Sequence, residues 1–326
     1  MSTALRVSRE ILTDSYQTIL ILFRILIPAL ILVKILDYFG ATEYLSALTQ
    51  PLMAPMGLPD MAGLIWATTM IVNIYTGVAV FLTLADPAEW TQAQTTCLAM
   101  LMLTTHNMVV ELRIAQQAGC RLLTQLFLRI FCAVFFCYLC YQLFETMQWL
   151  QQPAEFLWQA PQNNDTLSGW IIAQTLSLLK IAIVIVVLIA LLRIFKKIGV
   201  ERLLELLLTP VFQIMGLGRE AVTITIVGFT LGLAYGGGLL IKEARRGDIK
   251  KTDVFSSVSL LGICHSLIED TFLVLIIGAN LNTVLVLRLV LSILVISILV
   301  RLVQQMTEKT RHRFLYRRIN TAKTDY

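Results

Sequence analysis

The sequence predicts an all-α polytopic membrane protein that consists of two inverted-topology repeats. Of its 326 residues, 57% are hydrophobic and 14% are charged, and the mean hydropathy is +0.76. Soluble domains carry about 25% charged residues, so this composition leaves too little polar surface for a water-soluble fold. Each repeat is expected to contain three transmembrane helices, one re-entrant hairpin and one interfacial helix.

The repeat is visible as a set of uncommon residues that recur about 159 positions later in the chain. The matched pairs include Gly40 with Gly199, Pro51 with Pro210, His106 with His265, Glu111 with Asp270, Gly119 with Gly278 and Arg129 with Arg288. Duplicated polar residues within apolar segments are typical of a membrane transporter built from two repeats.

Eight segments are apolar enough to enter or cross a hydrocarbon core about 30 Å thick. They are 16–36, 61–85, 92–118, 121–144, 171–192, 220–241, 253–279 and 283–304. The short amphipathic segments 43–56 and 202–215 end near proline or glycine, which predicts interfacial helices. The first apolar segment is too long for a signal-peptide core, so no cleavable signal is expected.

Corresponding loops of the two repeats carry opposite charges. The stretch from Asp37 to Asp60 contains no lysine or arginine, whereas the matching stretch from Arg193 to Arg219 contains five. Because lysine and arginine are retained on the cytoplasmic side, the second repeat is predicted to be inverted relative to the first. Both termini and the loop 242–251 are then expected to be cytoplasmic.

Two of the apolar segments are predicted to be re-entrant hairpins. The segments 61–85 and 220–241 each have the same charge character at both ends, so each should enter and leave the membrane on one side. Their midpoints contain Asn73-Ile-Tyr-Thr-Gly77 and Ala234-Tyr-Gly-Gly-Gly238, in which glycine permits an unwound tip. A single tilted helix, with glycines that allow close packing, is the alternative.

The expected domain organisation follows from these segments. It consists of a cytoplasmic N-terminus at 1–14, a first repeat at 15–145, an extracytoplasmic linker at 146–169, an inverted second repeat at 170–305 and a basic cytoplasmic tail at 306–326. The linker contains no lysine or arginine, as an outer segment should. The six cysteines lie within or beside the predicted spans, so disulfides are not expected.

Two duplicated groups of polar residues form the candidate site. Ionisable groups at bilayer depth cost a few kcal/mol or more each and are tolerated mainly when they are paired or face a cavity. A single buried histidine most often makes a structural hydrogen bond, but retention of the motif in both copies favours a shared binding site between the repeats. The predicted substrate-binding residues are Asn73, Tyr75, Thr76, Gly77, His106, Asn107, Glu111, Tyr235, Gly236, Gly237, His265, Ser266, Glu269 and Asp270.

Two arginines within the spans are predicted to have structural roles. Arg129 is expected to pair with Glu111, and Arg288 with Asp270, inside the membrane. Binding of a substrate anion by these arginines is the alternative.

The HNxxxE motif at His106, the HSxxED motif at His265 and the two Tyr-x-Gly tips resemble the nucleoside-recognition Gate domain family, which includes the spore-maturation A and B proteins. The resemblance covers nearly the whole chain. It implies a multi-pass transporter-like protein of the bacterial inner membrane, with two Gate-like copies. The chain has no GxxxxGK[ST] loop, so nothing in it indicates nucleotide-driven transport.

The leading prediction is a permease for a small polar solute, nucleoside-like by resemblance, with proton coupling through the histidines and carboxylates as an added hypothesis. A divalent-metal permease is an alternative, because Cys264 and Glu269 add further metal ligands to the histidines and carboxylates above. A lipid or lipid-phosphate translocase and a non-transporting scaffold are others. The expected partners are the lipid bilayer and a small molecule or ion, and a homo-oligomer is left open. No enzyme activity is expected, because neither GxSxG nor HExxH occurs. No cofactor, resident metal or nucleic-acid partner is expected either.

Overall fold

The computed structural model describes residues 3–158, 166–247 and 249–317, and for residues 3–8, 201, 230–231 and 233–235 it describes the backbone alone. Over these ranges the chain is helical, and its two isolated β-bridges belong to no strand. The all-α polytopic prediction is confirmed, because five described helices are long and apolar enough to cross a bilayer. These are Arg9–Tyr38, Gln92–Gln117, Leu122–Met147, Leu167–Ile198 and Thr283–Gln305, of which Gln92–Gln117 combines the two consecutive helices described below.

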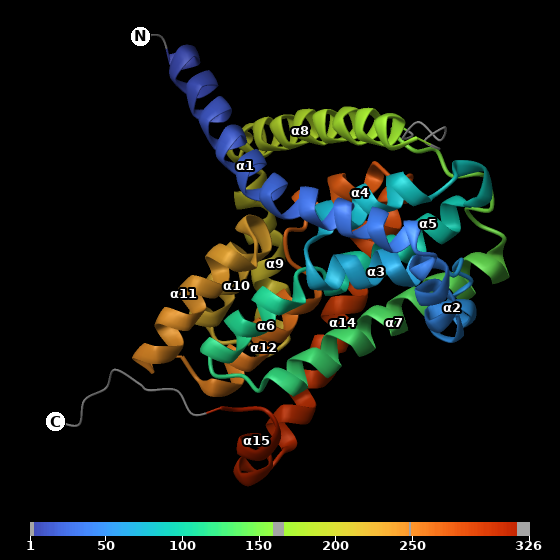
Figure 1. Cartoon of the computed structure of the whole chain (residues 1–326). Coiled ribbons are helices and arrows are strands. Elements are labelled where there is room, and N and C mark those ends of the chain that lie inside the picture. The colour runs from blue at the N-terminus through green and yellow to red at the C-terminus, as the bar shows by residue number, and fades with distance from the viewer. Residues whose placement is uncertain (1–2, 159–165, 248, 318–326) are drawn as a thin grey trace.

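The two halves of the chain contain the same order of helices (Figure 1). The first half contains α1 (Thr3–Tyr38), α2 (Ala41–Met53), α3 (Ala62–Ile71), α4 (Ile74–Leu84), α5 (Gln92–Thr105), α6 (Met108–Gln117) and α7 (Leu122–Met147). The second contains α8 (Leu167–Ile198), α9 (Val200–Ile214), α10 (Arg219–Leu231), α11 (Leu233–Arg246), α12 (Lys251–Ile263), α13 (Glu269–Leu275) and α14 (Arg288–Gln305). A π-helical turn at Thr283–Leu287 precedes α14, and α15 (Glu308–Phe314) follows it.

Matched glycines end the first helix of each half. Gly40 has a φ of 67° between α1 and α2, and Gly199 has a φ of 84° between α8 and α9. Glycine adopts this left-handed conformation without steric cost, so it ends one helix and redirects the chain. The short helices α2 and α9, which begin directly afterwards, occupy the segments expected to be interfacial.

The two predicted hairpin segments are pairs of short packed helices rather than single tilted helices. Helix α3 packs against α4, and α10 packs against α11. A Cβ atom on Gly77 would lie 1.9 Å from Oγ1 of Thr69, and one on Gly236 would lie 2.3 Å from Cα of Gly228. Glycine is therefore required at both positions, because any side chain would push the paired helices apart.

The predicted span 253–279 is not one continuous helix. Helix α12 ends at Ile263 and α13 begins at Glu269, so the backbone between them is unwound. The matching segment 92–118 also contains a break, between α5 and α6, although that break involves only His106 and Asn107. Unwound backbone at membrane depth is tolerated where it is buried in protein or lines a cavity.

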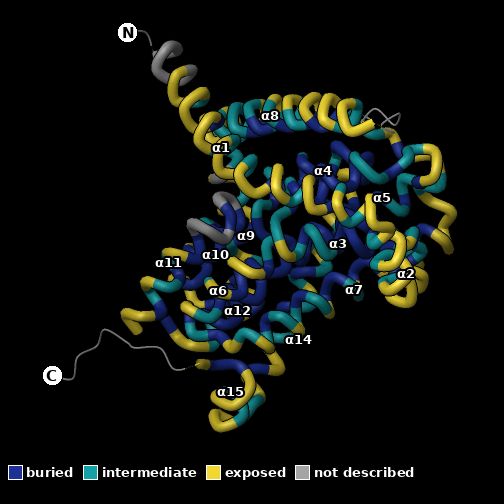
Figure 2. The backbone as a smooth tube through the Cα atoms, viewed as in Figure 1, coloured by how far each residue is buried: buried dark blue, intermediate teal, exposed yellow. Residues whose placement is uncertain are grey.

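Helices α1 and α8 expose long stretches of apolar surface (Figure 2). Ile21 on α1 and Ile183 on α8 are 61% and 56% exposed. In a membrane protein such residues face lipid, because hydrocarbon solvates them as well as a protein core does. Arg193, near the end of α8, pairs with Glu10 and Asp14 near the start of α1, so the two helices run antiparallel.

Different parts of the chain lie at the two ends of α7. At its start, Nε of Arg121 donates to the carbonyl of Tyr316, which brings the C-terminal segment to this end. Beyond its other end, the linker packs against the second half, where the backbone N–H of Leu157 donates to the carbonyl of Ile276 at 2.8 Å. The C-terminal segment and the linker therefore lie at opposite ends of α7.

The halves meet in a reciprocal way. Helix α6 of the first half packs against α11 of the second, and its counterpart α13 packs against α4 of the first. Such an exchange of equivalent contacts is what an approximate two-fold relation produces. The broken helices of both halves are thereby brought to one central region.

Candidate functional site

Both crossing segments break at matched positions, and each break carries a histidine. Asn107 has a φ of 52° and Ser266 has a φ of 44°, a left-handed conformation that is uncommon outside glycine. The hairpin of the same half accepts a backbone hydrogen bond from each break. Asn107 donates to the carbonyl of Thr69 at 3.1 Å, and Leu267 donates to that of Phe229 at 3.3 Å. The breaks are therefore supported features of the fold, since their backbone groups have partners.

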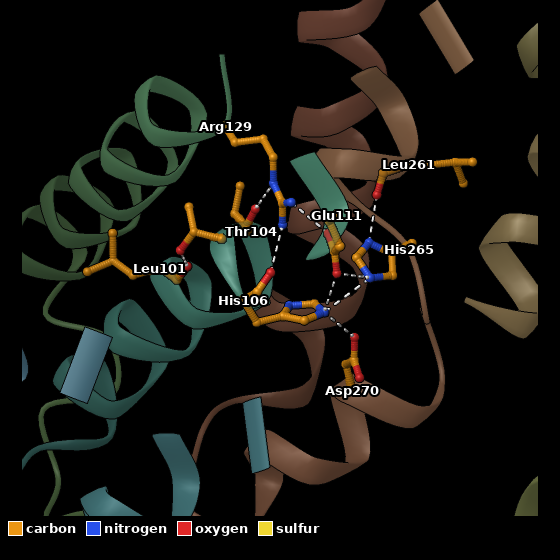
Figure 3. A network of polar contacts seen from close by, with 9 residues as sticks. Leu101, Thr104, His106, Glu111, Arg129, Leu261, His265 and Asp270 are labelled. Atoms are coloured by element: carbon orange, nitrogen blue, oxygen red, sulfur yellow. Dashed lines mark hydrogen bonds and ion pairs between the residues drawn. The ribbon is translucent and has the colours of Figure 1, made fainter. Parts of the chain in front are cut away.

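Four side chains converge between the breaks and are called the His-carboxylate cluster below: His106, Glu111, His265 and Asp270 (Figure 3). Nε2 of His106 lies 3.1 Å from Nε2 of His265. Oε1 of Glu111 lies 3.5 Å from Nε2 of His106 and 3.2 Å from Nε2 of His265. Oδ2 of Asp270 lies 3.4 Å from Nε2 of His106. All four residues are buried, so the cluster joins the two halves away from solvent.

The hydrogen bond of His265 fixes the state of its ring. Its Nδ1 lies 2.6 Å from the carbonyl oxygen of Leu261, and because a carbonyl only accepts, Nδ1 must be the donor. In the neutral ring, Nε2 of His265 then carries a lone pair, which faces Oε1 of Glu111 and Nε2 of His106. The contact of 3.1 Å then requires either a proton on Nε2 of His106, which donates to this lone pair, or a cation between the two nitrogens.

Arg129 supports the first half of the cluster. Its Nη1 lies 2.6 Å from Oε2 of Glu111, so the expected pair between these residues is present. Its Nε and Nη2 donate to the carbonyls of Thr104 and His106, each at 3.1 Å. Arg129 thus satisfies carbonyls that the break in α5 leaves without helical partners, and it turns the other oxygen of Glu111 toward the histidines.

The matching residue Arg288 is placed differently, and the predicted pair with Asp270 is absent. Arg288 is fully buried, and none of its three guanidinium nitrogens has a hydrogen-bond partner within the described part of the chain. Asp270 instead points to His106. The break before α13 is longer than that before α6, so Asp270 is the second residue of its helix whereas Glu111 is the fourth, and a π-helical turn directly precedes Arg288.

The hairpin residues contribute a second contact between the halves. The hydroxyl of Tyr75 donates to Oε1 of Glu269 at 2.7 Å. Asn73 has a local role, because its side chain accepts from the backbone N–H of Thr76 at 2.9 Å and so caps α4. The side chain of Tyr235 lies outside the described part of the structure, although its backbone belongs to α11.

The remaining predicted residues lie around the cluster and contribute through their backbones. Gly77 and Gly236 are the close-approach positions of the hairpins, and Gly237 is a buried residue of α11. Asn107 and Ser266 shape the breaks by their backbone conformation. These residues position the cluster, whereas the donor atoms that meet at its centre come from the two histidines and two carboxylates.

The sequence reading missed one buried contact between the halves. Nε2 of Gln125 on α7 donates to Oγ of Ser259 on α12 at 2.9 Å. Gln125 precedes Arg129 by four residues, so the two side chains share one face of α7. This spacing of polar residues in an apolar span was the available signal.

Comparisons with known proteins agree with this architecture. Residues 19–120 match the family model described as Gate, nucleoside recognition, which covers the segment from α1 to α6 and includes His106 and Glu111. A Bacillus subtilis (strain 168) protein described as the uncharacterized membrane protein YvoD is 25% identical over 300 residues, covering 87% of this chain and 90% of the relative. No solved structure matches. The chain is therefore a multi-pass membrane protein whose residues 19–120 match the Gate domain model.

Proposed function

We propose that this chain is a membrane permease whose central site is the His-carboxylate cluster. The observation that carries the proposal is the contact of 3.1 Å between Nε2 of His106 and Nε2 of His265, each at a helix break in a different half. Transporters built from repeats bind substrate and coupling ions where interrupted helices meet at the repeat interface. Buried ionisable residues in such a place are costly to retain, which supports a functional role.

The proposed solute is small and polar, and the Gate resemblance favours a nucleoside-like compound. The donor atoms of the cluster are too close together to admit an organic molecule between them. Such a solute would therefore lie beside the cluster, where Tyr75 and Glu269 offer a hydroxyl and a carboxylate. A solute that separated the two imidazoles would remove their mutual hydrogen bond, and a change in their protonation at that step would couple solute and proton movement.

The proposed orientation places both termini in the cytoplasm of a bacterial cell, with the two halves inverted in the membrane. Its support is the grouping of segments at the two ends of α7. The C-terminal segment with its arginines lies at one end, and the linker without lysine or arginine lies at the other. Under the positive-inside rule the first of these ends is cytoplasmic.

The proposal is tested in proteoliposomes that contain the purified full chain and an internal pH-sensitive dye. Uptake of radiolabelled uridine and adenosine would be measured with and without an imposed pH gradient. We expect His106→Gln and His265→Gln to abolish uptake or its dependence on the gradient, because glutamine keeps hydrogen bonding but does not titrate. His312→Gln is the matched control, since His312 lies on α15 outside the cluster.

Two outcomes would contradict the proposal. Uptake that is unchanged in the doubly substituted His106→Gln/His265→Gln protein would remove the cluster from the transport path. A cellular function that survives both substitutions but is lost on removal of the tail 306–326 would instead favour a membrane scaffold.

A further inference from the structure

We propose that the His-carboxylate cluster binds one divalent transition-metal ion of the Zn²⁺ class. The ligands are Nε2 of His106, Nε2 of His265, Oε1 of Glu111 and Oδ2 of Asp270. This inference rests on the proposed function only in treating the bound ion as one that the permease moves in addition to its solute. Binding itself can be measured without transport.

The spacing of the donor atoms matches a metal site. Zn²⁺ binds histidine nitrogen and carboxylate oxygen at about 2.0–2.2 Å, so two tetrahedral ligands on one ion lie about 3.3–3.6 Å apart. Four of the distances between these ligand atoms are 3.1 Å (His106 to His265), 3.2 Å (His265 to Glu111), 3.4 Å (His106 to Asp270) and 3.5 Å (His106 to Glu111). The two histidines and Asp270 each offer a ligand atom, and these atoms all lie within 4.8 Å of one another. Asp270 contacts His106 but not His265 or Glu111, so a bound ion would draw Asp270 toward the other three ligands.

The hydrogen-bond partners of His265 and Glu111 present these two ligands in the form that metals require. Nδ1 of His265 donates to the carbonyl of Leu261, which leaves the Nε2 lone pair directed into the cluster. Metal-binding histidines are usually held in this way by a backbone carbonyl or a carboxylate. Arg129 pairs with Oε2 of Glu111, so Oε1 remains as a single ligand atom.

The chemical types of the four ligands determine which metal ions the site would bind. Two imidazoles and two carboxylates suit Zn²⁺, Fe²⁺ or Co²⁺, whereas Ca²⁺ and Mg²⁺ prefer oxygen alone and Cu⁺ prefers thiolate or thioether. Cys264 precedes His265 in the chain, yet its sulfur is not one of the grouped ligand atoms in the described structure. The cluster is thus a site for a borderline divalent ion rather than for a soft one.

The neighbouring arginines indicate a transported ion rather than a permanent one. Arg288 is buried and has no hydrogen-bond partner among the described residues, and it interacts electrostatically with His106 and Asp270. Its positive charge opposes a cation in the cluster, as does that of Arg129. A conducted ion must bind weakly enough to leave, which this arrangement favours.

The test uses the full chain, purified in detergent and stripped with a chelator. Equilibrium dialysis against Zn²⁺ is expected to give one ion per chain, and Co²⁺ is expected to give the intense visible absorption bands of tetrahedral coordination. His106→Gln, His265→Gln and Asp270→Asn should each weaken Zn²⁺ binding by more than about tenfold, a loss at least as large as that caused by removing a second-shell partner. His312→Gln should bind as the unsubstituted chain does.

The Co²⁺ spectrum of the unsubstituted chain keeps the test valid if a variant fails to fold. Absence of tetrahedral bands, or Zn²⁺ binding that the two histidine substitutions leave unchanged, would overturn the metal site. Proteoliposomes with an internal Zn²⁺-sensitive dye separate the two proposals. Zn²⁺ binding without transport of Zn²⁺ or a nucleoside overturns the permease and supports the site, whereas nucleoside uptake by a chain that binds no metal does the reverse.

Discussion

Replacement of Arg129 by leucine should destabilise the protein far more than the same replacement of Arg288. Arg129 is 2% exposed, pairs with Glu111 at 2.6 Å and donates to two carbonyls at 3.1 Å each. Removing one partner of a buried ion pair costs about 3–5 kcal/mol, because the other charge is left uncompensated. The two orphaned carbonyls add about 1–3 kcal/mol each when water cannot reach them. These costs overlap, so the expected loss is roughly 4–8 kcal/mol.

Arg288→Leu is the matched control, because Arg288 occupies the equivalent position in the second half. It is fully buried and its guanidinium has no hydrogen-bond partner among the described residues. Its removal therefore sacrifices no hydrogen bond in this conformation, only the longer-range attraction between Arg288 and the carboxylate of Asp270. We expect a small loss of stability or a gain.

The double variant Glu111→Leu/Arg129→Leu separates the charge effect from the carbonyl effect. It should recover about 3 kcal/mol relative to Arg129→Leu, because no buried carboxylate is left without a partner. It should not reach the stability of the unsubstituted chain, since the carbonyls of Thr104 and His106 still lack donors. The assay is thermal and SDS-induced unfolding in detergent micelles, followed by tryptophan fluorescence. Equal losses for Arg129→Leu and Arg288→Leu, or no recovery in the double variant, would refute the reasoning.

Three further predictions concern the hairpins and the orientation. Tyr75→Phe removes the hydrogen bond to Glu269, so it should cost about 1–3 kcal/mol of stability in the same unfolding assay, and an unchanged midpoint would show that the contact is dispensable. Gly236→Ala should cost about 1–3 kcal/mol of stability, because its Cβ would lie 2.3 Å from the backbone of Gly228. Gly238→Ala is the control and should be neutral or stabilising, because the space around its Cβ is open. Similar effects at both positions would contradict the close approach of the two helices. Gly247→Cys in a cysteine-free chain should react with a membrane-impermeant thiol reagent only after the cells are opened, and labelling in intact cells would reverse the orientation.

The sequence by itself determined the solvent, and it predicted which polar residues meet in the central cluster. A composition with so few charged residues can only be solvated by lipid, and this holds whatever the packing is. The recurrence of His106 as His265 identified the cluster residues, because an ionisable group in a membrane is rarely kept without a role. The hairpin glycines could also be predicted from the sequence, since only glycine permits such close contact between helices.

Only the tertiary structure decided how the two matched motifs meet. The repeat predicts equal roles for Glu111 and Asp270, yet Glu111 pairs with Arg129 while Asp270 points to His106. This asymmetry follows from the different lengths of the two helix breaks, which local sequence preference does not fix. The contact of 3.1 Å between the histidines joins residues 159 positions apart. Its distance is set by how α6 packs on α11 and α13 on α4, because contacts between distant segments depend on the packing of whole helices rather than on neighbouring residues.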